Sequence, residues 1–453
     1  MLLDLPVELL EEIGCKLTQI DHASLRAVCT ALSGVMDRLF FSVLTLRICQ
    51  LRSENGVNIL RALATGTAGW SVYAKALRIV PGSRLETSKS QFVDLSDTEM
   101  HDLFVSALGT MRNIRITSWQ ILGNDPRWAR NAICNYLGTL PCLDDLQLES
   151  TGIVDFSFPE FLHLSKFKIK GYHGWSYPSE QIYQVIAQSR LTSLHLDGPG
   201  EWADVWSRLY AETGSPRSIH LTDIHTRIIT PDLFKYLASY SGIQRLTLNF
   251  PDGGSRNASN RLADTFFKTV LPRHASSLVE LSCPAGYESR WSFGPHNLHA
   301  VSQLHELRSL GMSINAGELK RIPPSPTAVA SGIGALRMGI DAQVVQSDID
   351  RAVVLLLQAA AALPALRQLT ILAADTESNR NVRGRNGIIH YTSAVTETIV
   401  VAVQNFSTNT PSPAIVNAGC RKYKLKPVGM DGTYTAKEGT SDAELLTYQE
   451  AEI

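Results

Sequence analysis

The chain has 453 residues, of which 44% are hydrophobic and 19% charged, an ordinary balance for a folded globular protein. This length exceeds what one hydrophobic core usually supports, so we expect two domains or a repeat array. Lysine and arginine number 42 against 43 acidic residues, and the net charge of -1 argues against a nucleic-acid partner.

The sequence contains no segment typical of a membrane span or a secretory leader. The longest apolar run, residues 352–366, includes Gln358 and Pro364 and is shorter than a bilayer-spanning helix requires. Asp4 and Glu8 lie where a signal peptide would carry basic residues. We therefore expect a cytoplasmic or nuclear protein with no membrane partner.

Residues 4–46 have the pattern of three short amphipathic helices. The first carries an apolar stripe with a four-residue spacing, formed by Leu5, Leu9, Ile13 and Leu17. Pro6 suits the first helical turn, and Glu8 favours the positive end of the helix dipole. Asp21 suits the cap of a second helix with Leu25 and Val28 on one face. Helices this small bury too little surface to be stable alone, so part of their apolar stripe should meet a partner or the next domain.

This stretch resembles an F-box, the helical module that docks a substrate receptor onto the Skp adaptor of cullin-RING ubiquitin ligases. The matching residues are Leu5, Pro6, Glu8, Leu9, Leu10, Ile13, Leu17, Asp21, Leu25, Val28, Cys29, Leu39 and Phe40. Leu32 stands where the family often has tryptophan. The resemblance implies an adaptor-binding surface made of Leu5, Pro6, Glu8, Leu9, Ile13, Leu25 and Val28. An ordinary three-helix cap on the following domain is the alternative.

The pattern LxxLxL recurs along the next part of the chain. With apolar substitutes allowed, it begins at residues 74, 111, 143, 164, 191, 216, 243, 278, 307, 333 and 366. Each copy alternates like a short strand, and helical patterns separate many of them. Most steps between copies fall near the ~20–29 residues of leucine-rich repeats, and some are longer.

This part resembles the repeat half of F-box/leucine-rich-repeat proteins, especially the divergent forms common in fungi. Regular repeats place Asn or Cys three residues beyond the LxL pair, and here only Asn315 fits. The resemblance implies an α/β fold: an N-terminal three-helix F-box followed by an irregular leucine-rich-repeat solenoid with a parallel sheet. A non-repeat α/β domain with coincidental strands is the alternative.

We divide the chain into an F-box-like module (1–46), a helical linker (47–73), an irregular leucine-rich-repeat domain (74–426) and a tail (427–453). Lysines alternate with Tyr423 and Leu425 before the tail, as in a half-exposed strand. The tail holds six acidic residues and one lysine, which favours disorder. We also expect loops at 94–102 and 251–260, and a loop followed by a strand at 382–394.

Motifs for catalysis or cofactor binding are absent from the sequence. It contains no GxSxG, HExxH, P-loop or GxGxxG pattern. The seven cysteines form no CxxC pair and the twelve histidines are dispersed, so we expect no metal site, no cofactor and no enzymatic activity.

The two resemblances together imply a substrate-recognition subunit of a Skp–cullin–F-box E3 ubiquitin ligase. Its partners would be a Skp-type adaptor, through it a cullin, and an unidentified client protein on the repeat domain. The alternative is a leucine-rich-repeat interaction scaffold that does not act in a ubiquitin ligase.

The client should contact the exposed face of the strands, where the residue between the two apolar positions lies. These residues are Arg78, Arg115, Gln147, Lys168, His195, His220, Thr247, Ser282, Gly311, Arg337 and Thr370, and none is acidic. Lys166, Lys168 and Lys170 share one strand face, and Arg115 should lie two repeats earlier. We predict that these four residues bind an acidic or phosphorylated client segment. A solvated sheet face is the alternative.

Overall fold

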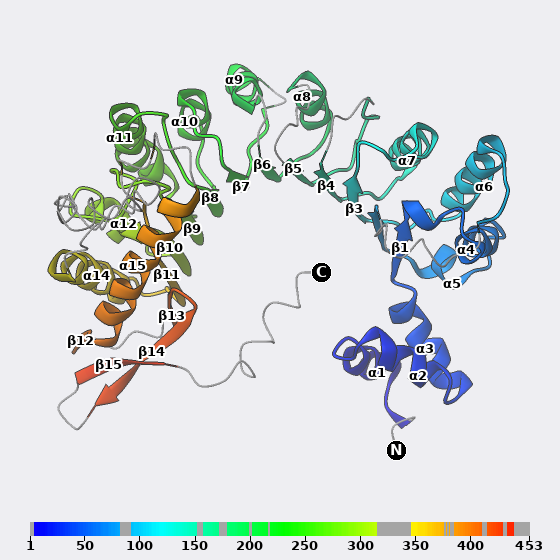
Figure 1. Cartoon of the computed structure of the whole chain (residues 1–453), viewed down its shortest axis with the longest axis horizontal. Helices are drawn as coiled ribbons and strands as arrows, with labels where there is room; N and C mark the ends of the chain where they lie inside the picture. Colours follow the sequence, from blue (N-terminus) through cyan, green and yellow to red (C-terminus); the bar gives the residue numbers. More distant parts are fainter. Residues whose placement is uncertain are drawn as a thin grey trace, which may run out of the picture. The chain divides into compact units, whose positions relative to one another are not determined.

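The structure is a computed structural model (Figure 1). It describes residues 4–81, 92–151, 157–171, 179–198, 202–215, 218–314, 346–375, 377, 380, 385–409, 415–428 and 433–438. The chain forms two compact units, Met1–Arg208 and Leu209–Ile453. The boundary between them falls within helix α9 (Trp202–Ala211).

Unit 1 begins with three helices, which are α1 (Val7–Gly14), α2 (Gln19–Arg26) and α3 (Thr30–Phe40). Their small core consists of Leu10, Val35 and Met36. Gly14 lets α1 approach α3 closely, because a Cβ atom at this position would lie 2.4 Å from Leu39 Cδ1. Thr18 begins α2 with a capping box that includes Asp21.

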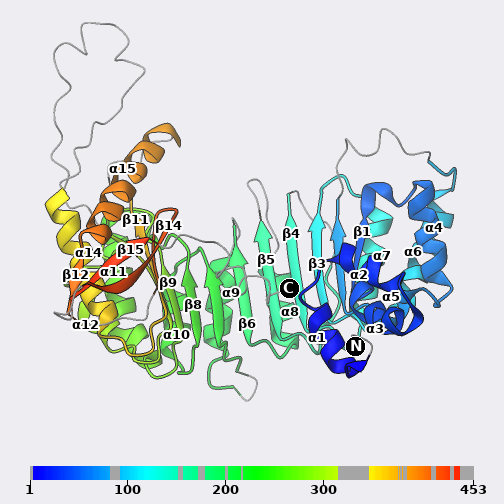
Figure 2. The same cartoon turned by 90° about the horizontal axis from the view of Figure 1, so that it is seen from below.

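The sheet of unit 1 is parallel throughout, with neighbouring strands in chain order. Its strands are β1 (Val43–Arg47), β2 (Ala76–Val80), β3 (Ile116–Ile121), β4 (Asp145–Ser150), β5 (Lys166–Gly171) and β6 (Ser193–Asp197). The helices that alternate with them are α4 (Glu54–Ala64), α5 (Gly69–Tyr73), α6 (Asp97–Gly109), α7 (Arg127–Thr139) and α8 (Ser179–Gln188). The helices cover one face of the strands (Figures 1 and 2).

Unit 2 begins with parallel strands and ends in antiparallel ones. The parallel strands are β7 (Asp223–Thr226), β8 (Arg245–Leu248), β9 (Glu280–Cys283), β10 (Ser309–Ile314), β11 (Gln368–Ala373) and β13 (Ile415–Ala418). The antiparallel strands are β14 (Arg421–Val428), β15 (Thr433–Glu438) and the short β12 (Ser407–Thr408). The principal helices are α10 (Pro231–Ala238), α11 (Arg256–Thr265), α12 (Leu298–Ser302), α14 (Gln346–Ala361) and α15 (Arg385–Gln404).

The core of each unit lies between its strands and its helices. On β4, Leu146 and Leu148 are buried while the residues between them are partly exposed, as the two-residue period of a strand requires. In unit 2 the rings of Phe234, Phe266 and Trp291 cluster with centroids 5.4–5.9 Å apart. The chain is therefore an α/β protein with a mostly parallel sheet, and this part of the predicted fold class is confirmed.

Two strands begin later than the LxxLxL pattern predicted. In the observed register, Thr117 and Trp119 of β3 occupy the inward positions that Leu146 and Leu148 hold on β4. Thr226 similarly takes an inward position on β7, and both threonines are fully buried. The LxxLxL pattern predicted these two strands too early in the chain, because a buried threonine does not match a leucine pattern. The copy predicted at 333 lies outside the described residues, and strands β1 and β13 were not predicted.

Several predicted loops are helical. Residues 94–102 include the start of α6, where Ser96 and Glu99 form a capping box, and residues 251–260 include the start of α11 after the cap residue Ser255. The strand predicted within 382–394 belongs to α15 as far as the structure describes it.

Part of the tail predicted to be disordered forms strands. Pro427 and Val428 complete β14, and Thr433–Glu438 forms β15, which pairs with β14 along six residue pairs. Threonine and tyrosine in this stretch favour strands, and β14 offers an edge for pairing. Residues 429–432 and 439–453 lie outside the described part of the chain. No helix in the described part is long and apolar enough to cross a membrane.

Candidate functional site

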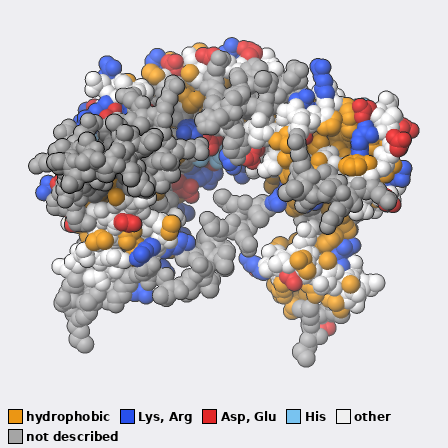
Figure 3. Space-filling model, in the orientation of Figure 1, with side chains coloured by type: hydrophobic (Ala, Val, Ile, Leu, Met, Phe, Trp, Pro, Cys, Tyr) orange, Lys and Arg blue, Asp and Glu red, His pale blue; other side chains and the backbone are white. Residues whose placement is uncertain are grey.

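The N-terminal helices expose several large apolar side chains. Val7, Leu9, Ile13, Ile20 and Val28 are 49%, 45%, 44%, 79% and 68% exposed, and apolar atoms are visible on this surface (Figure 3). Single exposed apolar residues are common on proteins, but five within 22 residues are a concentration. Leu9 and Ile13 lie one turn apart on the same side of α1. This side of α1 offers apolar contact area that an apolar partner surface could bury.

Helix α1 has a buried side and an exposed apolar side. Leu10 and Gly14 face α3 and are buried, whereas Leu9 and Ile13 are exposed. Part of the stripe was expected to meet a partner or the next domain, and Leu9 and Ile13 form the part that the described chain leaves exposed. Gly14 explains the choice, since its missing side chain makes room for Leu39 and Met36.

Polar contacts fix the three helices relative to one another. His22 Nε2 donates a hydrogen bond to the Gly14 carbonyl oxygen at 2.8 Å, which joins α2 to the end of α1. Arg26 pairs with Asp37 of α3, and its guanidinium group lies 4.4 Å from the ring centroids of both Phe40 and Phe41. The exposed apolar side chains are thus carried by a connected helical scaffold.

The predicted adaptor-binding residues occupy two environments. Leu5 and Leu25 are half-buried and pack against the small helical core. The others are exposed, namely Pro6, Glu8, Leu9, Ile13 and Val28. Val7 and Ile20 were missed by the sequence analysis, although both are exposed apolar residues on helices and could have been selected by residue type.

The three predicted lysines of β5 lie on its exposed face, but acidic residues accompany them. Asp145 and Glu149 of β4 stand opposite Lys166 and Lys170 in the strand register. Lys170 Nζ lies 3.6 Å from Glu149 Oε1, and on the other side Lys170 stands opposite Asp197 of β6. This face is therefore a mixture of charges rather than a purely cationic surface.

Lys168 differs from its two neighbours on β5. It stands between Gln147 of β4 and His195 of β6, with no acidic residue directly opposite in either described strand. Lys168 is also exposed, so its ammonium group is accessible to an anion. Within the predicted cluster it is the lysine best placed to hold an acidic group.

Asp145, the acidic residue opposite Lys166, has a pKa that is shifted by burial. The pKa of the Asp145 carboxyl is raised above its ordinary value mainly because burial disfavours its charge. A hydrogen bond from Gln147 and the charges of Lys166 and His195 oppose this shift. The charged carboxylate of Asp145 therefore compensates the charge of Lys166, but its burial costs some of the free energy of unfolding.

The structure does not place Arg115 in the row of Lys168. Ser118 occupies that position on β3, because Ser118 pairs with Gln147 and Gln147 with Lys168. Arg115 precedes β3, and its carbonyl oxygen accepts hydrogen bonds from the backbone N–H groups of Asp144 and Asp145. Within unit 2, His225 rather than the predicted His220 stands opposite Thr247 of β8. His220 instead stacks on Tyr240, with ring centroids 4.8 Å apart.

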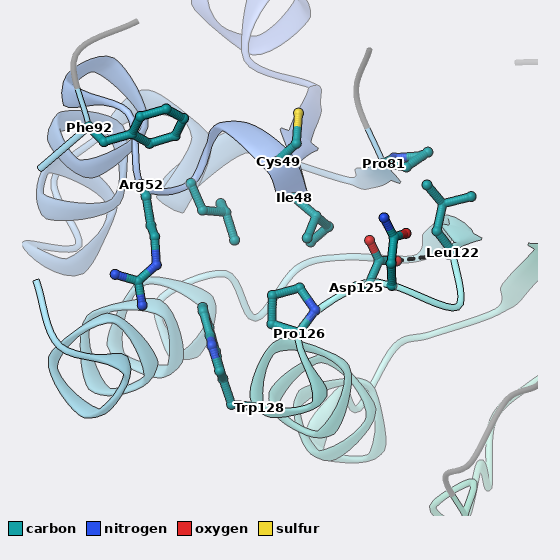
Figure 4. A pocket seen from close by; sticks show the side chains of 11 residues that line it. Ile48, Cys49, Arg52, Pro81, Phe92, Leu122, Asp125, Pro126 and Trp128 are labelled. Atoms are coloured by element: carbon teal, nitrogen blue, oxygen red, sulfur yellow. Dashed lines mark hydrogen bonds between the residues drawn. The ribbon is translucent and has the colours of Figure 1, made fainter. Parts of the chain in front are cut away.

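A cavity of about 220 Å³ opens near the carboxyl ends of β1, β2 and β3 (Figure 4). Its walls include Phe92, Trp128 and Pro126, and its polar lining includes Cys49 and Arg52. Arg52 donates hydrogen bonds to the Leu95 carbonyl oxygen and to Asp97. The cavity is smaller than the roughly 300–1,000 Å³ typical of small-molecule sites and suits a single side chain.

One carboxyl group of this cavity is also shifted by burial. Asp125 Oδ2 accepts a hydrogen bond from the Leu122 N–H at 2.8 Å, and burial raises the pKa of the carboxyl. No sequence motif marks this cavity, because its lining comes from the ends of three separate strands and from the start of α7. Residues 82–91 join two lining residues, Pro81 and Phe92, and lie outside the described chain.

The described residues contain no group of three or more His, Cys, Asp or Glu side chains that could hold a metal ion. Comparisons with protein-family models and with curated proteins give no match to this chain.

Proposed function

We propose that this protein is a substrate-recognition subunit of a Skp–cullin–F-box E3 ubiquitin ligase. The observation that carries the proposal is the exposed pair Leu9 and Ile13 on a three-helix unit whose sequence resembles an F-box. Their side chains are apolar and lie on the same side of α1. Leu10 and Gly14, on the other side of this helix, pack against α3. Burial of such side chains against a partner contributes about 1.5–3 kcal/mol each.

In this role the protein performs no chemistry on its client. The N-terminal helices bind the Skp-type adaptor, which is attached to the cullin, and the strand-bearing part of the chain binds the client. Holding both in one complex raises the effective concentration of the client near the ubiquitin-charged enzyme.

For the client, we propose an acidic or phosphorylated segment across the exposed face of β5. Lys168 would make the central charge-assisted hydrogen bond, because no acid stands opposite it in the register of β4 or β6. Lys166 and Lys170 would contribute less, since Asp145 and Glu149 stand opposite them. Arg115 is exposed but lies outside this row, so its contribution would require a client that extends to the start of β3.

The decisive test replaces the exposed pair by charges. The double variant Leu9→Asp with Ile13→Asp should lose co-purification with the Skp-type adaptor and with cullin. Its far-UV circular dichroism and melting temperature should remain close to wild type, because substitutions of exposed residues usually change stability by no more than about 0.5 kcal/mol.

Ile59 provides a matched control for this experiment. It lies on α4, outside the three N-terminal helices, and is 42% exposed, close to Leu9 and Ile13. Ile59→Asp should retain the adaptor. Undiminished adaptor binding by the double variant would overturn the proposal. Adaptor recovered from wild type without any cullin would favour a repeat-protein scaffold outside the ligase.

A further inference from the structure

Strand β14 carries a second lysine face, which consists of Lys422, Lys424 and Lys426, and all three side chains are exposed. Tyr423 lies between two of them and turns to the opposite face, where it is 1% exposed. Gln404 Nε2 of α15 donates a hydrogen bond to the Tyr423 hydroxyl oxygen at 3.4 Å. The Tyr423 side of β14 thus meets α15, and the lysines lie on the other side. Basic atoms gather at this place in the space-filling view (Figure 3).

The residues that pair with these lysines supply no negative charge. The partners in the described register are Asn417 and Ile415 on β13, and Lys437 and Thr435 on β15. Beyond β13 the same rows continue through uncharged residues, which are Gln368 and Thr370 on β11, and Ser309 and Gly311 on β10. The first acidic residue along these rows is Glu280 of β9, four strands from β14, or roughly 19 Å at the usual strand spacing.

Two arginines add positive charge at this end of the sheet. Arg367 directly precedes β11, Arg308 directly precedes β10, and both side chains are exposed. The Arg308 carbonyl oxygen accepts a hydrogen bond from the Arg367 N–H, and the Arg367 carbonyl oxygen accepts one from the Ile415 N–H. Both arginines therefore lie in one row with the start of β13.

These five cations have no acidic counterpart in the part of the chain that the structure describes. No ion pair there joins either arginine or a lysine of β14 to an acidic residue. Like charges on alternate residues of a strand repel one another, and an anion lying over them relieves this repulsion. The surface therefore favours an anionic partner.

The spacing of the lysines indicates the form of that partner. Residues on one face of a strand recur at every second position, which places successive lysines of β14 about 6.8 Å apart. An extended peptide with an acidic residue at every second position presents its carboxylates with the same period. Each carboxylate then accepts a charge-assisted hydrogen bond from one lysine.

A single-stranded nucleic acid fits this face less well. Proteins that bind single strands combine positive charge with aromatic side chains on which the bases stack. The one aromatic residue of β14, Tyr423, is buried on the opposite face, and none of the described partners of the lysines is aromatic. The observations therefore favour a peptide.

We propose that the lysine face of β14 binds an extended acidic segment of a partner protein, with carboxylates on alternate residues paired to Lys422, Lys424 and Lys426. Arg308 and Arg367 add electrostatic attraction that speeds the encounter with such a segment. This inference does not depend on the proposed role in a ubiquitin ligase, and its tests involve neither adaptor nor cullin.

Calorimetric titration of the full chain at low salt with two synthetic hexapeptides tests the proposal. One peptide alternates glutamate with threonine, and the other has three consecutive glutamates followed by three threonines, so both have the same composition and charge. The alternating peptide should bind about twofold more tightly, because it places one more carboxylate on the face that meets β14. Salt at about 1 M should abolish binding of both peptides, since the screening length falls to about 3 Å.

Substitution of the lysines locates the site. The triple variant Lys422→Gln, Lys424→Gln, Lys426→Gln should bind the alternating peptide about tenfold more weakly, which corresponds to three exposed ion pairs, and should lose the preference between the peptides. The corresponding glutamine variant of the three lysines of β5 is the matched control. It should weaken binding less, because acidic residues stand opposite two of those lysines.

Cross-linking and a nucleic-acid probe complete the test in wild type, so the result does not rely on how the variants fold. Zero-length carbodiimide cross-linking should join the alternating peptide to lysines of β14. A four-nucleotide oligothymidylate, with a charge equal to that of the peptides, should bind more weakly. Tighter binding of the oligonucleotide would overturn the assignment to a peptide. Equal affinities for the two peptides, or cross-links only to lysines outside β14, would overturn the proposed site.

Discussion

Strands β5 and β14 share one sequence pattern but have different electrostatic surroundings. β5 reads KFKIK and β14 reads KYKLK, and in both the lysines are on the exposed face while Phe167 and Tyr423 are buried. On β5 acids of β4 and β6 stand opposite two of the three lysines. On β14 the described neighbours of the lysines are uncharged on β13. A strand's own sequence therefore determines which face its lysines occupy, and the neighbouring strands determine whether the charge is compensated.

The difference follows from where each strand lies in its sheet. β5 lies inside a parallel ladder, between β4, which places Asp145 and Glu149 opposite its lysines, and β6, which places Asp197 opposite Lys170. β14 belongs to the antiparallel end of unit 2, after the uncharged row Ser282, Gly311 and Thr370 on β9, β10 and β11. An anionic partner therefore competes with built-in acids on β5 and meets no such competition from the described strands around β14.

The largest expected effect concerns the buried aromatic residue between the lysines, which is Phe167 on β5 and Tyr423 on β14. Phe167→Ala and Tyr423→Ala should each lower the free energy of unfolding of their own unit by about 3–5 kcal/mol, because each removes a buried aromatic ring. Urea denaturation followed by fluorescence and circular dichroism measures this change.

Lys168→Ala and Lys424→Ala are the controls on the exposed face, and each should change stability by no more than about 0.5 kcal/mol. If Tyr423→Ala left unit 2 as stable as wild type, the side chain of Tyr423 would not stabilise β14 as Phe167 stabilises β5. That result would contradict the comparison of the two strands.

A smaller effect should distinguish the two lysine faces. Lys170→Gln removes the pair with Glu149 and should cost about 0.2–1 kcal/mol at low salt. Lys424 stands opposite Ile415 on β13, so Lys424→Gln removes repulsion from the neighbouring lysines and should be neutral or slightly stabilising. Both differences should shrink as salt is raised, which denaturation at two salt concentrations can measure. Equal losses from both substitutions would contradict the contrast between the strands.

The sequence predicted those parts of the fold that depend on local alternation. The strands β4, β5 and β6 lie at their predicted copies of LxxLxL, because leucine, phenylalanine or isoleucine fills the inward positions. Strands β3 and β7 were misplaced because Thr117 and Thr226 fill such positions. The strand β15 was missed because its acidic, glycine-containing surroundings resemble disorder, while its stability depends on pairing with β14.

The candidate site was less predictable, because exposure depends on tertiary packing. Helix α1 has apolar residues on two sides, and the close approach of Gly14 to Leu39 decides which side is buried. Similarly, nothing within β5 indicates that Glu149 lies beside Lys170, since 21 residues separate them in sequence and the register brings them together. The sequence therefore showed the row of lysines on β5, but it did not show that acidic residues of β4 stand opposite two of them.

The smallest expected effect is a pH dependence on β5 that β14 lacks. Burial raises the pKa of Asp145 above its ordinary value of 3.8, so the folded state binds this proton more tightly than the unfolded state. As the pH falls from 7 through the raised pKa, this group therefore adds to the free energy of unfolding.

The variant Asp145→Asn lacks this contribution, so the stability of the variant relative to wild type should be greatest near pH 7 and decline toward pH 4. Lys424→Gln should show no such trend over this range, since the residue opposite Lys424 on β13 is Ile415, which carries no carboxyl group. Urea midpoints at several pH values measure both series, and a difference between Asp145→Asn and wild type that stays constant with pH would show that Asp145 is not destabilised by burial.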